Sequence, residues 1–220
     1  MNTEMRFFIA ISDVVSIMNL TCGFLSIIMA INHDFVLSAI FMILSLIFDS
    51  SDGWVAHKTN RADEYGFGKN IDSLSDIISF GLAPAIFLYS YSTQILTIAV
   101  GLVIVICGVL RLTRYNVISN EFTDFIGFPI PGIAIIISTF YLTGLFNIYI
   151  ASILAIIISF AMICNKRYDK FSNSYLLTIN GLCILLIILQ IPLKIYNINI
   201  PALIVFLTSL IYLLINLIEG

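Results

Sequence analysis

Long apolar runs recur along the whole chain. Of the 220 residues, 60% are hydrophobic and only 10% are charged, whereas soluble domains carry about 25% charged residues. Several runs approach the roughly 20 residues that a helix needs to cross a bilayer. The eight apolar segments are 13–31, 35–57, 72–91, 95–115, 128–145, 148–164, 174–193 and 199–217. This pattern predicts an integral membrane protein.

The same segments indicate helices rather than strands. In lipid, only helices or closed barrels satisfy the backbone hydrogen bonds, and barrel strands alternate in polarity over about ten residues. The segments here are longer and do not alternate. We therefore predict an all-α polytopic transmembrane helical bundle with about eight spans, forming one integral membrane domain over 1–220. We expect a catalytic core at about 13–164 and a C-terminal helical hairpin at 174–217, which we interpret as hydrophobic scaffold.

The positions of Lys and Arg predict the orientation, because cytoplasmic loops are enriched in both. With a cytoplasmic N-terminus and eight spans, only Lys194 falls outside. The cytoplasmic set is Arg6, Lys58, Arg61, Lys69, Arg111, Arg114, Lys166, Arg167 and Lys170. We expect a multi-pass protein of the cell membrane with the 57–71 loop on the cytoplasmic side. The formal net charge of −3 argues against a nucleic-acid partner.

Four aspartates flank this loop. Asp49 and Asp52 are three residues apart, and Asp72 and Asp76 are four apart. Both spacings put two carboxylates on one face of a helix. Carboxylates beside hydrocarbon are costly, and like charges raise the cost. Protonation would relieve this cost, and divalent cations are the other solution: four charges of −1 balance two ions of +2, and Mg²⁺ or Mn²⁺ prefers such oxygen ligands. Paired metal ions of this kind are typical of phosphoryl chemistry.

Two further features fit an anionic ligand. Gly53 and Ala56 lie on or beside the face of the first aspartate pair, where small residues allow either a ligand or another helix to approach. We also expect Asp72 and Asp76 in the first turns of a helix, whose N-terminus favours phosphate. In the first apolar segment, we expect Asp13 to be solvated and Asn19 to make an interhelical hydrogen bond, with a nucleotide contact as the alternative.

The aspartate pattern resembles the signature of the CDP-alcohol phosphotransferases, D-x2-D-G-x2-A-R-x8-G-x3-D-x3-D. This chain has Asp49-x2-Asp52-Gly53-x2-Ala56 and then Asp72-x3-Asp76. It departs from the signature at two points. His57 stands where the signature has Arg, for which Arg61 or Lys58 is a candidate replacement. The loop is also two residues longer, so that Gly66 keeps the first spacing, to Asn70, and Gly68 keeps the second, to Asp72.

Four other stretches resemble the phosphatidylserine synthase branch of that family. They are MNLTCGFLSI at 18–27, DSLSDIISFGLAPA at 72–85, LRLTRYNV at 110–117 and FIGFPIPG at 125–132. With the aspartate pattern, the resemblance covers roughly 13–140. It implies a CDP-linked lipid as donor, either CDP-diacylglycerol or CDP-archaeol. The hydroxyl of L-serine attacks the lipid-side phosphorus, and CMP leaves. The resemblance also implies that the protein forms a homodimer and that it is surrounded by membrane lipids.

The resemblance also implies roles for individual residues. Asp49, Asp52 and Asp72 are expected to hold two divalent cations, and Asp76 to touch a metal and act as general base. The expected nucleotide-binding residues are Gly53, Ala56, Arg61 and Gly68.

Two arginines end the fourth apolar segment. Arg111 and Arg114 either anchor the helix at the membrane surface or bind an anionic group, the serine carboxylate or a lipid phosphate, because the guanidinium fork matches both. Asn116 is expected to assist.

Two alternatives stay open. A transferase of the same fold with glycerol 3-phosphate or inositol phosphate as acceptor needs more cationic groups than this chain offers. A cation transporter usually binds its ion near the bilayer midplane at broken helices, whereas these aspartates flank a loop at one face.

Overall fold

The structure is a computed structural model of the chain. It describes residues 9–58, 66–118, 125–168, 174–191 and 193–219, without the side chains of 52–58, 167, 218 and 219.

Helices make up nearly all of the described chain, as the sequence predicts. Three consecutive pieces, α3, the π-helix η2 and α4, form one continuous stretch that corresponds to the third apolar segment. The helices are α1 Ile11–Ile31, α2 Phe35–Lys58, α3 Phe67–Asp76, η2 Ile77–Leu82, α4 Ala83–Tyr91, α5 Ile95–Ile118, α6 Pro131–Leu142, α7 Ile148–Ile163, α8 Ser174–Ile188 and α9 Ile200–Glu219. The strands are β1 Phe125–Ile126, β2 Arg167–Tyr168, β3 Lys194–Ile195 and β4 Ile198–Asn199. The all-α bundle is therefore confirmed.

Four helical stretches within the described residues are long and apolar enough to cross a membrane. They are Ile11–Ile31, Phe67–Tyr91, Ile95–Ile118 and Ile200–Leu217, and the other apolar helices are shorter. The prediction of about eight spans therefore holds only approximately. The apolar segments do form helices, but four of the described stretches are long enough to cross a membrane by length and composition.

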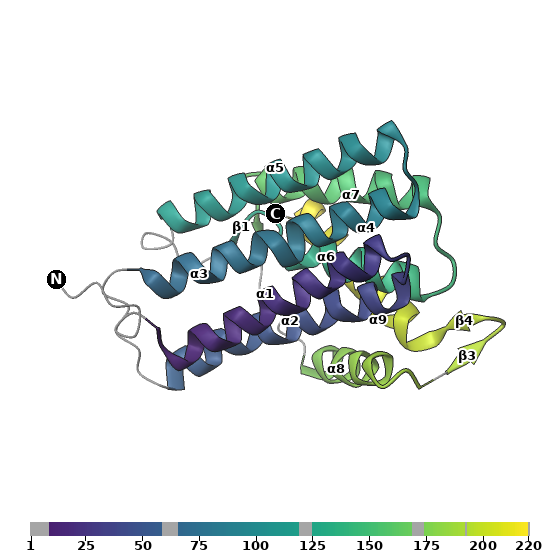
Figure 1. The fold of residues 1–220 in the computed structure, drawn as a ribbon, viewed down its shortest axis with the longest axis horizontal. Helices are drawn as coiled ribbons and strands as arrows, with labels where there is room; N and C mark the ends of the chain where they lie inside the picture. The colour runs from purple at the N-terminus through teal and green to yellow at the C-terminus, as the bar shows by residue number, and fades with distance from the viewer. Residues whose placement is uncertain (1–8, 59–65, 119–124, 169–173, 192, 220) are drawn as a thin grey trace.

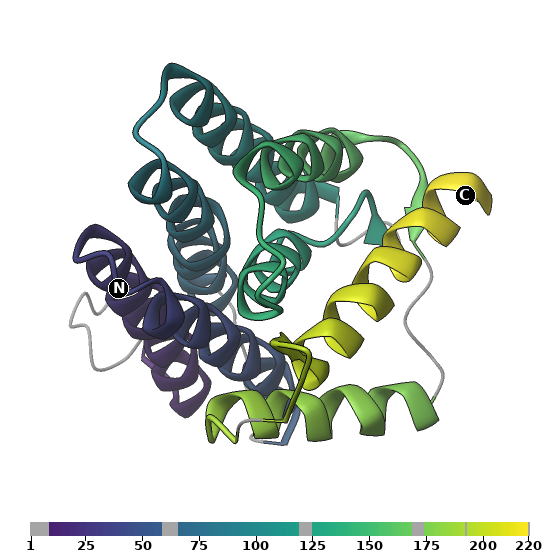
Figure 2. The ribbon, with the colours of Figure 1, turned by 90° about the vertical axis from the view of Figure 1, so that its right-hand side faces the viewer.

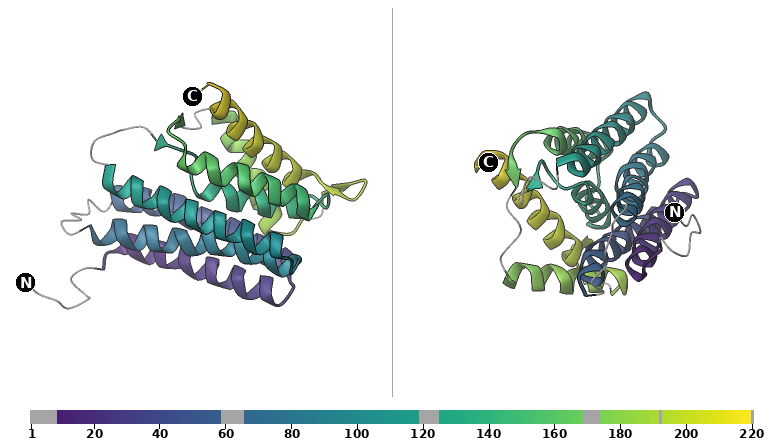
Figure 3. Two further views of the ribbon diagram at one scale, coloured as in Figure 1. Left: turned by 90° about the horizontal axis from the view of Figure 1, so that it is seen from above. Right: turned by 90° about the vertical axis from the view of Figure 1, so that its left-hand side faces the viewer.

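The helices α1 to α7 run roughly along one axis, and the last two depart from it. α1 packs along α2, and the α3–α4 stretch lies beside α1 and α5 (Figure 1). α8 lies at one side of the bundle against α2 and α9 (Figure 2). α9 crosses the others obliquely and packs on α6 (Figure 3). The C-terminal pair is thus attached to the face formed by α2 and α6.

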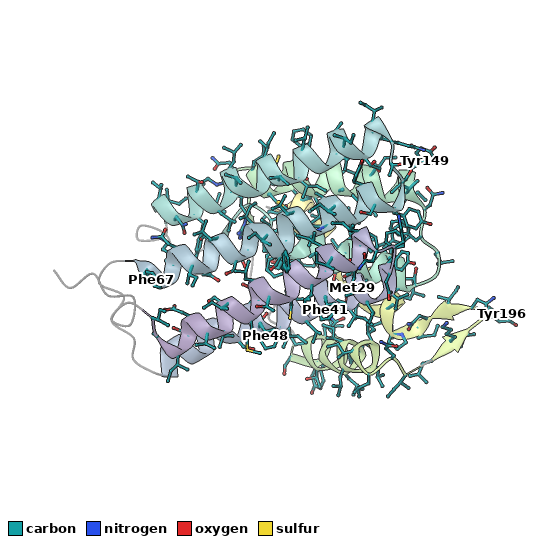
Figure 4. The ribbon with its side chains drawn as sticks, in the orientation of Figure 1. Met29, Phe41, Phe48, Phe67, Tyr149 and Tyr196 are labelled. Carbon is teal, nitrogen blue, oxygen red and sulfur yellow. The ribbon has the colours of Figure 1, made fainter. Side chains whose placement is uncertain are left out.

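The outer surface of the bundle is apolar. Ile95, Leu102 and Val117 are 85%, 58% and 73% exposed, a pattern that costs free energy in water but none against lipid tails. Aromatic side chains lie near both ends, with Phe67 at one and Tyr149 and Tyr196 at the other (Figure 4). Aromatic residues favour the two membrane interfaces, so the long axis of the bundle fits the bilayer normal.

The polar face of α1 points inward. Ser16, Asn19 and Ser26 are buried, and Ser26 Oγ donates to the carbonyl oxygen of Ser38 in α2 at 2.9 Å. The expectation that Asp13 is solvated is wrong. Asp13 is 1% exposed, and its Oδ2 accepts a hydrogen bond from the backbone N–H of Ala10 at 2.8 Å. The carboxylate therefore satisfies a backbone donor just before the first turn of α1.

α1 approaches the third helical stretch closely at Gly23. A Cβ at this position would lie 2.6 Å from the Cα of Ser79 in η2, a distance at which a backbone must move. We expect Gly23→Ala to lower the free energy of unfolding by about 1–3 kcal/mol, the usual cost of overpacking. Thermal unfolding in detergent measures this change.

Gly181→Ala in α8 is the matched control, because a Cβ there meets nothing within 4 Å. It should leave the melting temperature unchanged or raise it, since Ala is the better helix former. Equal melting temperatures for the two variants would contradict the tight contact at Gly23.

Candidate metal and substrate site

Three carboxylates converge near the end of the bundle where α2 ends and α3 begins (Figure 1). Asp49 comes from α2, and Asp72 and Asp76 come from α3. Each offers one oxygen, and these three oxygens lie within 4.8 Å of one another. Asp76 is only 6% exposed, and the other two are half-buried. Asp72 and Asp76 are an i,i+4 pair on one face of α3, and their carboxylates converge with that of Asp49 from α2.

The third helical stretch begins earlier than the hydropathy predicts. α3 starts at Phe67, after Gly66 in the left-handed conformation at φ 66°. Asp72 therefore lies in the second turn, and Asp76 is the last residue of α3. The expectation that both aspartates sit in the first turns of a helix is wrong, and the helix N-terminus does not contribute to this cluster.

The longer loop leaves either Asn70 or Asp72 as the third aspartate position of the signature, and the structure distinguishes the two. Asn70 is exposed, whereas Asp72 belongs to the carboxylate group. Gly66 has a local conformational role, because a positive φ favours glycine. Gly68 lies half-buried in the first turn of α3. The counting that keeps Asp72 therefore agrees with the geometry.

A π-helix begins directly after Asp76. η2 spans Ile77–Leu82, and π-helical turns inside α-helices are frequent at functional sites. Ser79 of η2 donates from Oγ to the carbonyl oxygen of Asn19 in α1 at 3.0 Å. η2 therefore holds the end of α3 against the inward polar face of α1.

Asn19 is the polar partner of the buried carboxylate. Its side chain is fully buried, and Nδ2 donates to Asp76 Oδ1 at 3.0 Å. This confirms the predicted interhelical hydrogen bond. Asn19 Oδ1 is also buried, and it has no hydrogen-bond partner among the described residues. The Asn19 amide therefore holds Oδ1 of Asp76 with its Nδ2, and its own Oδ1 is a further hydrogen-bond acceptor at the same place.

The two arginines of α5 have different surroundings. Arg111 is 7% exposed, its charge acts on Asp76 and Asp49, and its Nε has no hydrogen-bond partner within the described chain. Its Cζ lies 5.9 Å from the centre of the Tyr115 ring. Arg111 is thus a buried cation beside the carboxylates with donor capacity left over.

Arg114 binds the backbone instead. NH1 donates to the carbonyl oxygen of Ile163 at 3.0 Å, and NH2 donates to those of Ile126 at 3.0 Å and Met162 at 2.9 Å. Two of these carbonyls belong to the last turn of α7, where helical acceptors lack partners. Arg114 therefore ties α5 to the end of α7 and to β1.

Asn116 links α5 to α3. Its Nδ2 donates to Ser73 Oγ at 2.9 Å, and its backbone carbonyl oxygen accepts a hydrogen bond from Lys69 Nζ at 2.6 Å. Both partners flank Asp72 on α3, so Asn116 positions the helix that carries two of the carboxylates. Sequence reasoning missed Ser73 and Lys69, although Lys69 precedes Asp72 by three residues and so lies on the same side of a helix.

The remaining predicted residues are only partly described. Asp52, Gly53 and Ala56 lie in α2 within one to two turns of Asp49, and nothing is described of their side chains. Arg61 lies outside the described residues. Their predicted roles stay predictions.

Residues 9–165 match the family model of the CDP-alcohol phosphatidyltransferases. The chain belongs to this family of membrane enzymes, which favours an enzyme over the cation transporter. It is 47% identical over 165 residues to an archaetidylserine synthase of Methanothermobacter thermautotrophicus, covering 74% of this chain and 71% of that relative.

Several further relatives are CDP-diacylglycerol–serine O-phosphatidyltransferases by name, among them two from an archaeon and a bacterium. The one from Methanocaldococcus jannaschii is 38% identical over 190 residues, covering 86% of this chain and 88% of the relative. The one from Bacillus subtilis is 29% identical over 164 residues, covering 72% and 89%.

The bonds of Arg114 predict a structural role. We expect Arg114→Gln to lower the melting temperature in detergent, because hydrogen bonds to a charged group are each worth about 1.5–3 kcal/mol and three carbonyls lose their partner. Thr113→Ala, an exposed neighbour on α5, is the control and should melt like the wild type. An unchanged melting temperature for Arg114→Gln would contradict this role.

Proposed function

We propose that the protein transfers a phosphatidyl-type group from a CDP-linked lipid to L-serine and releases CMP. The observation that carries this proposal is the convergence of Asp49, Asp72 and Asp76 within 4.8 Å at one end of an apolar bundle, near enough to the buried Arg111 for an electrostatic interaction. The names of the relatives support serine as the acceptor. CDP-diacylglycerol and CDP-archaeol are both candidate donors.

The donor set fits divalent cations. Carboxylate oxygens within 4.8 Å of one another are hard ligands that suit Mg²⁺ or Mn²⁺. Asp49, Asp52, Asp72 and Asp76 are the residues that would hold two such ions. When bound, the ions neutralise the pyrophosphate of the donor and stabilise the charge that develops on CMP.

Asp76 is the proposed general base. A serine hydroxyl is a weak nucleophile that needs a base within hydrogen-bond reach. As its oxygen attacks the lipid-side phosphorus, the P–O bond to CMP breaks and the proton passes to the Asp76 carboxylate. The bond from Asn19 to Asp76 Oδ1 restrains the rotamer of the base, and Asn116 steadies α3 from the other side.

Arg111 is the proposed ligand of the serine carboxylate. It is buried beside the aspartates and retains donor capacity, whereas the guanidinium of Arg114 is engaged by three carbonyls. A single additional cation suits serine, which carries one carboxylate and its own ammonium group. Glycerol 3-phosphate and inositol phosphate bring a phosphate of higher negative charge, which needs more cations.

The remaining parts of the proposal follow the sequence. Gly53, Ala56, Arg61 and Gly68 contact the nucleotide, the aspartates face the cytoplasm because the Lys and Arg residues gather on their side, and the N-terminus is cytoplasmic. The enzyme is a homodimer of single-domain chains in the cell membrane.

CMP release by the detergent-purified protein tests the proposal directly. With a CDP-lipid, Mn²⁺ or Mg²⁺ and a panel of serine, glycerol 3-phosphate and inositol phosphate, we expect release with serine. Asp76→Asn should reduce kcat by about 10²–10⁴-fold, the usual contribution of a general base. Chelation with EDTA should abolish release in the wild type.

Asp34→Asn is the matched control for this measurement. Asp34 accepts from the backbone N–H of Leu37 at 3.1 Å before α2, a bond that Asn can replace, and it lies at the start of the helix that carries Asp49. The variant should keep wild-type activity. Release with a phosphorylated acceptor alone would overturn serine as the acceptor.

Arg111→Lys tests the acceptor ligand. Lys keeps the charge but loses the planar fork, so we expect KM for serine to rise about tenfold or more while KM for the CDP-lipid stays within about twofold. Steady-state kinetics separates the two constants, and the melting temperature checks the fold. A rise in the donor KM alone would assign Arg111 to the lipid phosphate instead.

A further inference from the structure

A cavity of about 480 Å³ lies at the end of the bundle opposite the carboxylate cluster, where the β3–β4 hairpin extends beyond α8 (Figure 1). Its walls come from α2, α4, α6, the end of α8 and the hairpin. Ile40, Ile187, Gln190, Lys194 and Asn199 are among the residues that line it. We call this space the hairpin cavity.

We propose that the hairpin cavity binds a phospholipid of the adjoining leaflet. Lys194 and Asn199 donate to the lipid phosphate, and the hydrocarbon next to the headgroup lies along Ile40 and Ile187. The cavity is remote from the carboxylates, so it is separate from the donor and acceptor sites of the proposed reaction. In the proposed orientation of the protein, this leaflet is the outer one.

The walls of the cavity are apolar inside and polar at the mouth. Ile40, in the second turn of α2, and Ile187 of α8 are 6% and 5% exposed. Gln190, Lys194 and Asn197 line the same space and are exposed. A ligand that fills it therefore needs an apolar part next to a polar part. A phospholipid has both, and apolar walls bury its hydrocarbon without leaving polar groups unsatisfied.

Lys194 supplies the positive charge of the cavity. No Asp or Glu is among the described residues that line it, and Nζ forms no hydrogen bond or ion pair with another described residue. Asp34, an acid at the same end, accepts from the backbone N–H of Leu37 and does not line the cavity. Basic pockets between transmembrane helices bind anionic lipid headgroups, so the charge of Lys194 suits a lipid phosphate.

The β3–β4 hairpin holds this charge in place. Tyr196 and Asn197 form its two-residue turn, with φ of 49° and 65°, as a tight hairpin requires. Lys194 pairs with Asn199 across the two strands, so their side chains lie on one face. The backbone N–H of Asn199 donates to the carbonyl oxygen of Thr143 at 3.1 Å. This bond fixes the hairpin to the end of α6.

Asn199 offers a second donor beside Lys194. Its Oδ1 accepts from the backbone N–H of Ala202 at the start of α9 at 3.4 Å. That bond orients the amide and leaves Nδ2 as a donor without a partner among the described residues. Lys194 Nζ and Asn199 Nδ2 can therefore each donate to one oxygen of a phosphodiester, and the bond from the ammonium group is strengthened by charge.

Gln190 lines the mouth in a backbone conformation that favours glycine. It follows α8 at φ 52°. Its N–H donates to the carbonyl oxygen of Ile187 at 3.0 Å, and the N–H of Ile191 donates to that of Leu186 at 3.1 Å. This is the helix ending in which glycine is usual, and another residue there costs free energy. A glutamine in this place adds a polar side chain to the cavity in return.

The hairpin also lies at the depth of lipid headgroups. Tyr196 is 96% exposed at the far end of the bundle from Phe67 (Figure 4), and the neighbouring Ile195 is exposed as well. Aromatic residues favour the interface between lipid and water. The mouth of the cavity beside this turn is therefore where a lipid phosphate resides.

A lipid in this position would connect weakly attached parts of the fold. α8 has only two buried residues among those described, Cys183 and Ile187. The hairpin cavity is bounded by α8 and the hairpin on one side and by α2 and α6 on the other. A bound phospholipid therefore joins the C-terminal elements to the rest of the bundle and should raise the melting temperature.

Two isosteric charge changes test the site. Gln190→Glu adds a negative charge at the mouth of the cavity, and Gln94→Glu adds it on the exposed α4–α5 turn at the same end, outside the cavity. Native mass spectrometry with phosphatidylglycerol measures the Kd of each full-length variant. We expect Gln190→Glu to raise Kd about tenfold, because its carboxylate repels the phosphate and competes for Lys194. Gln94→Glu should match the wild type, and equal Kd values for the two variants would overturn the proposal.

Three probes identify the ligand. Phosphatidylglycerol has phosphate and hydrocarbon, dioleoylglycerol has the hydrocarbon alone, and inorganic phosphate has the anion alone. Comparing each probe between the wild type and Gln190→Glu cancels lipids bound elsewhere on the bundle. We expect this difference for phosphatidylglycerol only. An equal difference for dioleoylglycerol would overturn the role of the phosphate, and an equal difference for inorganic phosphate would overturn a lipid as the ligand.

Replacement of Lys194 tests the contact with the phosphate. We expect Lys194→Gln to raise the Kd for phosphatidylglycerol about tenfold, whereas Lys194→Arg keeps the charge and should stay within about twofold of the wild type. An unchanged Kd for Lys194→Gln would overturn the contact. Lys194 lies outside the carboxylate site and binding is read without turnover, so the result is independent of the proposed reaction.

Gln190→Gly separates lipid binding from folding. Glycine relieves the positive φ, so we expect the variant to melt at or above the wild type in detergent without phospholipid. Added phosphatidylglycerol should then raise its melting temperature less than that of the wild type, because a cavity contact is lost. An equal rise for the two proteins would overturn the role of Gln190.

Discussion

Three carboxylates that converge at the end of an apolar bundle must be compensated, because hydrocarbon solvates charge poorly. Several neighbouring side chains compensate the negative charge. Asn19 turns the polar face of α1 inward to donate to Asp76, and Arg111 brings a buried positive charge from α5. The remaining negative charge fits divalent cations. Helices α1, α2, α3 and α5 are thus held to one another partly by the charge that they enclose.

The third helical stretch, α3 to α4, links the carboxylates to α1. Asp76 ends α3, η2 widens the helix at once, and Ser79 and Gly23 bring that turn against the backbone of α1. The side-chain amide of Asn19 therefore bonds to Asp76 at the end of α3, and the backbone carbonyl oxygen of Asn19 bonds to Ser79 in η2. Because a π-turn changes the direction of the side chains that follow it, a small shift of α1 along η2 would move the carboxylate that we propose as the base.

The approximate positions of the helices follow from the sequence because lipid exposure demands long apolar runs, and the convergence of Asp49 with Asp72 and Asp76 follows from the i,i+4 spacing on the far side of one loop. Other features depend on tertiary contacts that no local pattern records. The polar turn that opens α3 at Phe67 carries no hydropathy signal, and Asp13 is buried while its carboxylate accepts from the backbone N–H of Ala10. Arg111 and Arg114 are the same residue type three positions apart, and tertiary contacts separate them: Arg114 is bound by carbonyl oxygens of α7 and β1, whereas Arg111 is buried near the aspartates.

The two proposed substrates differ in polarity, and the surroundings of Asp49 differ in the same way. On one side lie Asp72, Asp76 and the cation Arg111, and on the other lies a cavity with mainly apolar walls between α2, α6, α8 and α9. A molecule with a charged pyrophosphate and hydrocarbon chains has its polar–apolar boundary at the phosphorus to be attacked. Under the proposed function, a water-soluble acceptor would approach that atom from the charged side of Asp49.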